Sequence, residues 1–107
     1  MDEVFRDDAV LEWPGSGEQL VGAENRRAVY ARTPSLPKVT NRHIIGEGNL
    51  WVAEARMTYG IKPYAACLVF VMRHDRIAKQ IGYWAEPSVA PEWRAPWMKT
   101  LDPAHRT

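Results

Sequence analysis

The clearest pattern along this chain is a strict alternation of two sets of side chains between residues 50 and 59. Every second position carries an aromatic, alanine or methionine side chain, and the positions between them are mixed or charged. A period of two predicts a β-strand with one face better buried than the other. The better-buried face is expected to carry Trp51, Ala53, Ala55, Met57 and Tyr59, and the other face Val52, Glu54, Arg56 and Thr58.

Residues 64–72 are apolar at every position after the initial tyrosine, so both faces of a strand here would be apolar. A strand of this kind is expected to be covered on both sides. The chain has one good helical segment, which can cover only one face of a sheet. Because a large exposed apolar patch is unusual on a monomer, we expect a second copy to cover the outer face and predict a homodimer through it.

Prolines, glycines and charged residues divide the rest of the chain into shorter elements. Pro14, Gly15 and Gly17 separate two short strands and predict a hairpin. A helix, a hairpin and a run of longer strands indicate an α+β fold with a mostly antiparallel sheet. The predicted strands are 10–13, 18–21, 38–45, 50–59, 64–72 and 77–86; residues 2–8 are read as the last turn of a short helix, 23–31 as a second helix, and the segment from 87 as an extended tail pinned by its tryptophans.

The composition is that of one ordinary globular domain. The 107 residues are 46% hydrophobic and 25% charged with a formal net charge of +1, so we assign residues 1–107 to one domain with a tail at 87–107. Scattered Lys and Arg argue against a nucleic-acid partner, and no apolar run approaches the ~20 residues that span a membrane. Cys67 is the only cysteine in the sequence, so an internal disulfide is excluded. The acidic start lacks an apolar signal core, so the cytoplasm is the expected location.

Three short phrases resemble the nuclear transport factor 2-like cone fold, and more closely its SnoaL-like branch. They are Asp7-Asp8-Ala9-Val10-Leu11-Glu12-Trp13-Pro14, then Gly22-Ala23-Glu24-Asn25, then Arg76-Ile77 followed by Gly82-Tyr83-Trp84. The resemblance implies a strongly bent, mixed, mostly antiparallel sheet wrapped around one or two helices and a mostly apolar pocket. It also implies dimers packed through the sheet. Compared with the family, the helical stretch at the start of this chain is short.

The resemblance also implies which residues surround the pocket. It places an aromatic and aliphatic lining with one amide there, suited to a flat apolar ligand; the simpler interpretation is that these side chains fill a core. The family's known reactions do not carry over, because Trp13 stands where ketosteroid isomerases have an aspartate base. Their oxyanion-hole acid falls near Leu68, and the aspartate of a related epoxide hydrolase falls near Gly82. The implied lining is Trp13, Leu68, Phe70, Met72, Gln80 and Trp84.

Three side chains are candidates for acid–base catalysis. Imidazole titrates near neutral pH, so His43 is a candidate general base. Glu54 lies two residues from Arg56, a cation that would hold a pocket acid ionised, and Tyr59 offers a hydroxyl to a ligand. For His43 and Glu54 the simpler interpretations are a structural polar group and a solvated or interface salt bridge. The histidines lie far apart and no phosphate loop is present, so neither a metal nor a cofactor is expected.

The sequence leaves three functions open. The first is a dimeric pocket protein for a small apolar metabolite, with catalysis not established. The second is an acid–base enzyme of the polyketide cyclase, isomerase or hydrolase kind. The third is a non-catalytic interaction or regulatory domain with a filled core. The lining of the cavity separates them, because an enzyme needs a titratable group beside the cavity and a binding protein does not.

Overall fold

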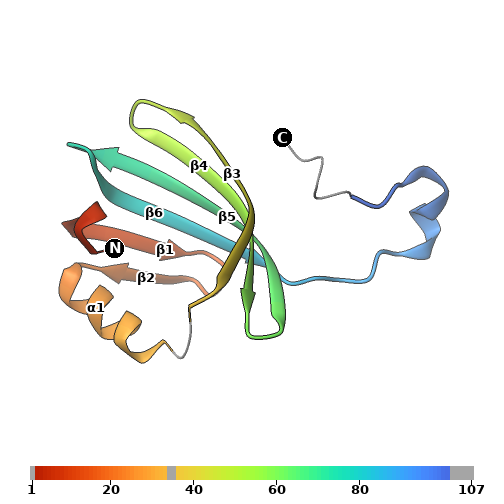
Figure 1. The fold of residues 1–107 in the computed structure, drawn as a ribbon, viewed down its shortest axis with the longest axis horizontal. Coiled ribbons are helices and arrows are strands. Elements are labelled where there is room, and N and C mark those ends of the chain that lie inside the picture. The colour runs from red at the N-terminus through yellow and green to blue at the C-terminus, as the bar shows by residue number, and fades with distance from the viewer. Residues whose placement is uncertain (1, 34–35, 102–107) are drawn as a thin grey trace.

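One six-stranded sheet carries the fold in the computed structural model, which describes residues 2–33 and 36–101 (Figure 1). The strand order is β2-β1-β6-β5-β4-β3. β1 and β6 run parallel, and all other neighbouring pairs are antiparallel, which confirms the predicted α+β fold with a mixed, mostly antiparallel sheet. The elements are η1 (Asp2–Val4), β1 (Phe5–Trp13), β2 (Glu18–Val21), α1 (Ala23–Arg32), β3 (Lys38–Glu47), β4 (Leu50–Tyr59), β5 (Lys62–Arg73), β6 (Arg76–Ala85) and η2 (Glu92–Trp97).

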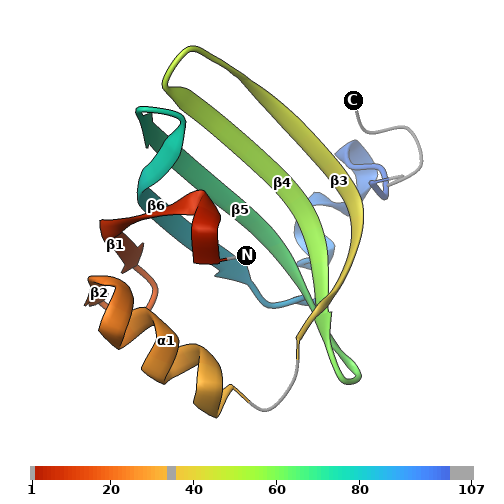
Figure 2. The same cartoon turned by 60° about the vertical axis from the view of Figure 1, so that its left-hand side comes forward.

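The sheet is strongly bent, and irregular register accompanies the bend. Pairing shifts between Thr40 and His43 of β3 and between Val71 and Met72 of β5. Asn41, inside the first shift, has a φ of 54°. Bulges of this kind bend a strand and increase its twist. Figure 2 shows the long strands curving around the side on which α1 lies; we call this concave side the inner face and the opposite side the outer face.

The strand register assigns side chains to the two faces. Residues directly opposite each other on neighbouring strands share a face, and successive residues alternate. Leu11 belongs to the same buried cluster as Phe5, over which Arg26 of α1 lies, so the row that contains Leu11 is inner. The inner rows are Leu11–Gln80–Phe70–Trp51, Gly82–Leu68–Ala53–Ile44, Trp84–Ala66–Ala55 and Tyr64–Met57; two outer rows are Ile81–Val69–Val52–Ile45 and Tyr83–Cys67–Glu54–His43.

α1 covers only one end of the inner face. It packs against β1 and β2, and Arg26 is its one buried residue, with 1% of its surface exposed. The guanidinium carbon of Arg26 lies 4.7 Å from the centre of the Phe5 ring, within the range of a cation–π interaction. Phe5 joins Ala9 and Leu11 in the buried core. Within the described ranges, no helix has the length and apolar character needed to cross a membrane.

The prediction of a helical turn at residues 2–8 is wrong beyond Val4. Only Asp2–Val4 forms a short 3₁₀ turn, and β1 begins at Phe5. The reason is tertiary: Phe5 pairs with Ile77 of β6 and is buried beneath α1. Strand formation depends on such neighbours more than on local preference. The predicted hairpin of β1 and β2 is confirmed by their antiparallel pairing.

The segment after β6 leaves the sheet on the side opposite α1, as Figures 1 and 2 both show. It is not extended throughout, because Glu92–Trp97 forms a 3₁₀ helix. Trp93 and Trp97 are 73% and 78% exposed. The radius of gyration is 16.1 Å, against about 13 Å for a compact chain of this length. The tail therefore extends away from the body of the sheet; residues 102–107 of the predicted tail lie outside the described residues.

Candidate functional site

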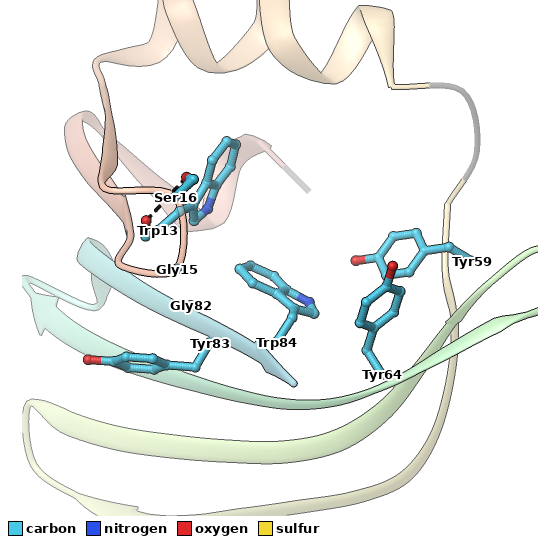
Figure 3. A pocket seen from close by; sticks show the side chains of 8 residues that line it. All are labelled: Trp13, Gly15, Ser16, Tyr59, Tyr64, Gly82, Tyr83 and Trp84. Atoms are coloured by element: carbon cyan, nitrogen blue, oxygen red, sulfur yellow. Dashed lines mark hydrogen bonds between the residues drawn. The ribbon is translucent and has the colours of Figure 1, made fainter. Parts of the chain in front are cut away.

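A hollow of about 550 Å³ opens on the inner face, at the end of the sheet away from the buried core (Figure 3). Its walls come from the end of β1 and the turn that follows, from the end of β4, the start of β5 and the end of β6. Four aromatic rings on these strands turn toward the same space. The lining residues are Trp13, Gly15, Ser16, Tyr59, Tyr64, Gly82, Tyr83 and Trp84.

Trp84 forms the floor of the hollow because a glycine lies beneath it. Its six-membered ring covers Gly82 so closely that a Cβ at that position would collide with the ring. The indole Nε1 of Trp84 donates a hydrogen bond to the sulfur of Met57, at 3.4 Å. Trp84 is therefore held at both ends of its ring system, by the glycine below it and by the thioether of β4.

Tyr59 and Tyr64 form the wall at the β4–β5 turn. Their ring centres are 5.7 Å apart and the rings are inclined at 78°, the edge-to-face arrangement that aromatic pairs prefer. The Tyr59 hydroxyl lies 3.8 Å from the Met57 sulfur, toward which it is directed as a donor. Burial raises the pKa of the Tyr59 phenol above its usual value. The phenol is therefore neutral near pH 7 and acts as a hydrogen-bond donor, with little capacity as a base.

Trp13 is placed by the tight turn between β1 and β2. The Gly17 and Ser16 amides donate to the Trp13 carbonyl oxygen, at 2.9 and 3.2 Å, and Gly17 takes a φ of 75°, which favours glycine. The Ser16 hydroxyl donates to the Glu18 carboxylate at 2.7 Å. Glu18 pairs with Trp13 across the hairpin, so this carboxylate is fixed at the rim beside the first aromatic wall.

The residues implied as pocket lining fall into two groups. Trp13 and Trp84 line the hollow. The other four are not among its lining residues. Leu68, Phe70 and Gln80 lie on the inner face by register, and Met72 is opposite Ile77 at the far end of β5. The hollow stops at Gly82, and the inner face beyond it leads toward the buried core of Phe5, Ala9 and Leu11, against which Ile77 packs.

The three catalytic candidates are not brought together. Tyr59 lines the hollow. His43 and Glu54 are directly opposite each other on β3 and β4, in an outer row that also contains Cys67 and Tyr83. Neither His43 nor Glu54 is among the residues that line the hollow, although Tyr83 of the same row is. Among the described residues, no three His, Cys, Asp or Glu side chains converge in a group that could hold a metal ion.

Sequence reasoning missed Tyr64, Gly82, Tyr83 and the turn residues Gly15 and Ser16 as parts of the lining. A signal existed for two of them. Tyr64 begins the apolar strand and lies opposite Met57, on the same inner row. Gly82 stands two residues before a tryptophan on the same strand, a spacing at which a large ring can fold back over the glycine. Nothing in the sequence marks Gly15 and Ser16 as more than a turn.

Comparisons with known protein families and with solved structures agree on the fold of this chain. The model of the SnoaL-like domain family matches residues 1–80. A crystal structure of an NTF2-like protein of unknown function from Burkholderia xenovorans is 31% identical with a TM-score of 0.81, over 94% of this chain and 80% of that chain. A match over 94% of the chain must extend past Ala85 into the tail. No curated protein matches the sequence.

Two more distant structures share the fold. A candidate ketosteroid isomerase from Kribbella flavida is 14% identical with a TM-score of 0.82, over 94% of this chain and 75% of that chain. A hypothetical protein with a ketosteroid isomerase-like fold from Catenulispora acidiphila, solved in complex with trimethylamine, is 19% identical with a TM-score of 0.63, over 78% and 72%. At these identities the likeness concerns the fold, which hosts many unrelated functions.

Proposed function

We propose that this chain, which belongs to the SnoaL-like domain family, is a pocket protein that binds a small ligand through the ligand's apolar surface. The observation that carries the proposal is the aromatic wall of the hollow, to which Trp13, Tyr59, Tyr64 and Trp84 contribute. Ligand pockets of a few hundred Å³ are typically lined in this way, with few polar groups. The Catenulispora protein, which has this fold, was solved in complex with the small molecule trimethylamine, and this supports the proposal.

Binding is favoured over acid–base catalysis by what lines the hollow. Of the described residues around it, none is a histidine or a carboxylic acid. The one titratable candidate that reaches it, Tyr59, has a pKa raised by burial and stays protonated. A general base needs a pKa near the working pH and reach to the proton it removes. The hollow offers apolar area and hydroxyl groups, which support binding.

A thermal-shift experiment tests the proposal. A ligand that binds only the native state raises the melting temperature by mass action. We expect 2-naphthol, choline or 3,3-dimethylbutan-1-ol, each tested alone at millimolar concentration, to include at least one stabilising compound. Trp84→Ala should remove the ligand-induced shift, measured against its own baseline. Trp93→Ala, which removes an exposed tryptophan outside the hollow, should keep it. If no compound stabilises the wild-type chain, the binding proposal fails.

We also propose that the protein is a homodimer that packs through the outer face. The outer row Ile81–Val69–Val52–Ile45 crosses four strands and is apolar throughout, and Ile45 is 61% exposed. The tail with Trp93 and Trp97 leaves the sheet on this same side. A second copy would bury the row and receive the tail, and a two-fold axis would repeat both contacts.

A further inference from the structure

We infer that the ligand group received by the hollow is a methylated ammonium, a cation whose surface is made of methyl groups. The inference rests on the proposed function and narrows it to one chemical class. It is carried by the aromatic rings, by the way their polar atoms are used, and by the position of one carboxylate.

Rings from four different strand ends face one space. Trp13 ends β1, Tyr59 ends β4, Tyr64 lies near the start of β5 and Trp84 near the end of β6 (Figure 3). The faces of such rings carry negative partial charge, and tryptophan is the strongest of the three aromatic residues in attracting a cation. Groups of aromatic rings of this kind recognise quaternary ammonium ions. Two indoles and two phenols fit that chemistry better than an aliphatic hollow of equal size would.

Two of the four polar groups on these rings are turned into the wall itself. The Trp84 indole nitrogen and the Tyr59 hydroxyl are both directed at the sulfur of Met57, at 3.4 and 3.8 Å. A primary ammonium brings three N–H donors that lose water on entry and need acceptors. A quaternary ammonium has no N–H group and loses no hydrogen bond there. The arrangement therefore favours the methylated cation over an unmethylated one.

The charge at the rim has the matching sign. Ser16, a lining residue, holds the Glu18 carboxylate through a 2.7 Å hydrogen bond, and Glu18 stands opposite Trp13 in the hairpin. Among the described residues that line the hollow, none is a lysine or an arginine. Glu18 is solvent-exposed, and a carboxylate at the mouth of a hollow attracts cations and disfavours anions. The rim thus favours ligands with a positive charge, and the aromatic rings favour ammonium ions that carry methyl groups.

The decisive experiment compares choline with 3,3-dimethylbutan-1-ol by isothermal titration calorimetry. The two molecules have nearly the same shape, and they differ in whether a nitrogen cation or a neutral carbon carries the three methyl groups. We expect choline to bind about five- to thirtyfold more tightly, since a partly desolvated cation–π contact contributes on the order of 1–2 kcal/mol. Ethanolamine, which lacks the methyl groups, should bind more weakly than choline. Equal affinities for choline and its neutral analogue would overturn the inference.

Two variants separate this inference from the broader proposal. Glu18→Gln should weaken choline binding several-fold and leave 3,3-dimethylbutan-1-ol unchanged, whereas Glu92→Gln, an exposed carboxylate of the tail, should change neither. If 2-naphthol or the neutral alcohol stabilises the chain and choline does not, binding at the hollow stands and the cation assignment is wrong. If Trp84→Ala leaves choline affinity unchanged, the cation binds elsewhere and the inference fails.

Discussion

At the scale of single residues, the hollow depends on one missing side chain. Gly82 carries no Cβ, and the ring of Trp84 occupies the space that a Cβ would need. The Leu68 Cδ2 atom would also lie only 3.3 Å from that added carbon. A glycine inside a strand normally weakens the strand. Here it permits the tryptophan to lie along the floor, so the glycine is explained by the ring that covers it.

Gly82→Ala is therefore expected to destabilise the protein, although alanine is ordinarily the better strand residue. Displacing the indole should lower the free energy of unfolding by about 1–3 kcal/mol, the usual effect of overpacking. Urea unfolding monitored by tryptophan fluorescence measures it. Gly15→Ala is the control, because nothing lies within 4 Å of its added Cβ. A Gly82→Ala protein as stable as the wild type would show that Trp84 is not confined in this way.

The raised pKa of Tyr59 gives a prediction about alkaline pH. Burial raises the pKa of Tyr59 in the folded state, whereas in the unfolded chain the phenol has its ordinary pKa of about 10. At a pH just above about 10, the folded chain therefore still holds the Tyr59 proton and the unfolded chain has lost it. The native state then binds more protons, so stability falls as pH rises through about 10. A spectrophotometric tyrosinate titration should show that Tyr59→Phe removes a component that titrates above the ordinary phenol pKa. Tyr83→Phe should leave that component in place; loss of the same component there would contradict the assignment.

At the scale of elements, alternation predicted the strands and their faces well. The period of two between residues 50 and 59 sets Tyr59 and Glu54 on opposite faces, which the register bears out. The pattern does not reveal the side on which His43 lies, because the bulge between Thr40 and His43 changes the count along β3. The strand at Phe5 was missed because its partner, β6, is distant in sequence.

The docking of α1 gives the prediction for this scale. Arg26 is its buried residue and lies over Phe5, so Arg26→Ala should lower stability by about 2–3 kcal/mol through lost packing and lost cation–π attraction. Arg26→Met retains the apolar stem and should lose roughly 1 kcal/mol. Chemical denaturation compares the two. Arg32→Ala, which removes an exposed hydrogen bond to the Ala28 carbonyl, should have little effect, and an equal loss there would argue against docking through Arg26.

At the scale of the whole molecule, the outer face and the tail are the features that one chain leaves uncovered. The apolar row through Val69 lies on the outer face, and the tail that carries the exposed Trp93 and Trp97 leaves the sheet on that side. The apolar strand at 64–72 predicted this face from sequence. The extent of the hollow was not predictable in the same way, because it depends on how far the sheet bends and on where α1 ends, and no local pattern encodes either property.

Val69→Asp tests the dimer. If the outer face is buried between two copies, an unpaired carboxylate there should prevent association, because burying it is unfavourable. Size-exclusion chromatography with light scattering should give a dimer for the wild type and a folded monomer for Val69→Asp, with folding checked by circular dichroism. Ile61→Asp places the same charge in the turn between β4 and β5, where the side chain is 96% exposed and lies outside the outer row, and should remain dimeric. A wild-type monomer at micromolar concentration would refute the proposal.

The aromatic hollow as a binding site is tested most directly by following the indole N–H signals of the five tryptophans by nuclear magnetic resonance during a titration with choline. Substituting each tryptophan in turn assigns the signals. We predict that the Trp13 and Trp84 signals shift together and saturate, while those of Trp93 and Trp97 stay in place. Shifts confined to the tail tryptophans, or no saturable shift at Trp13 and Trp84 with either choline or 2-naphthol, would contradict the account.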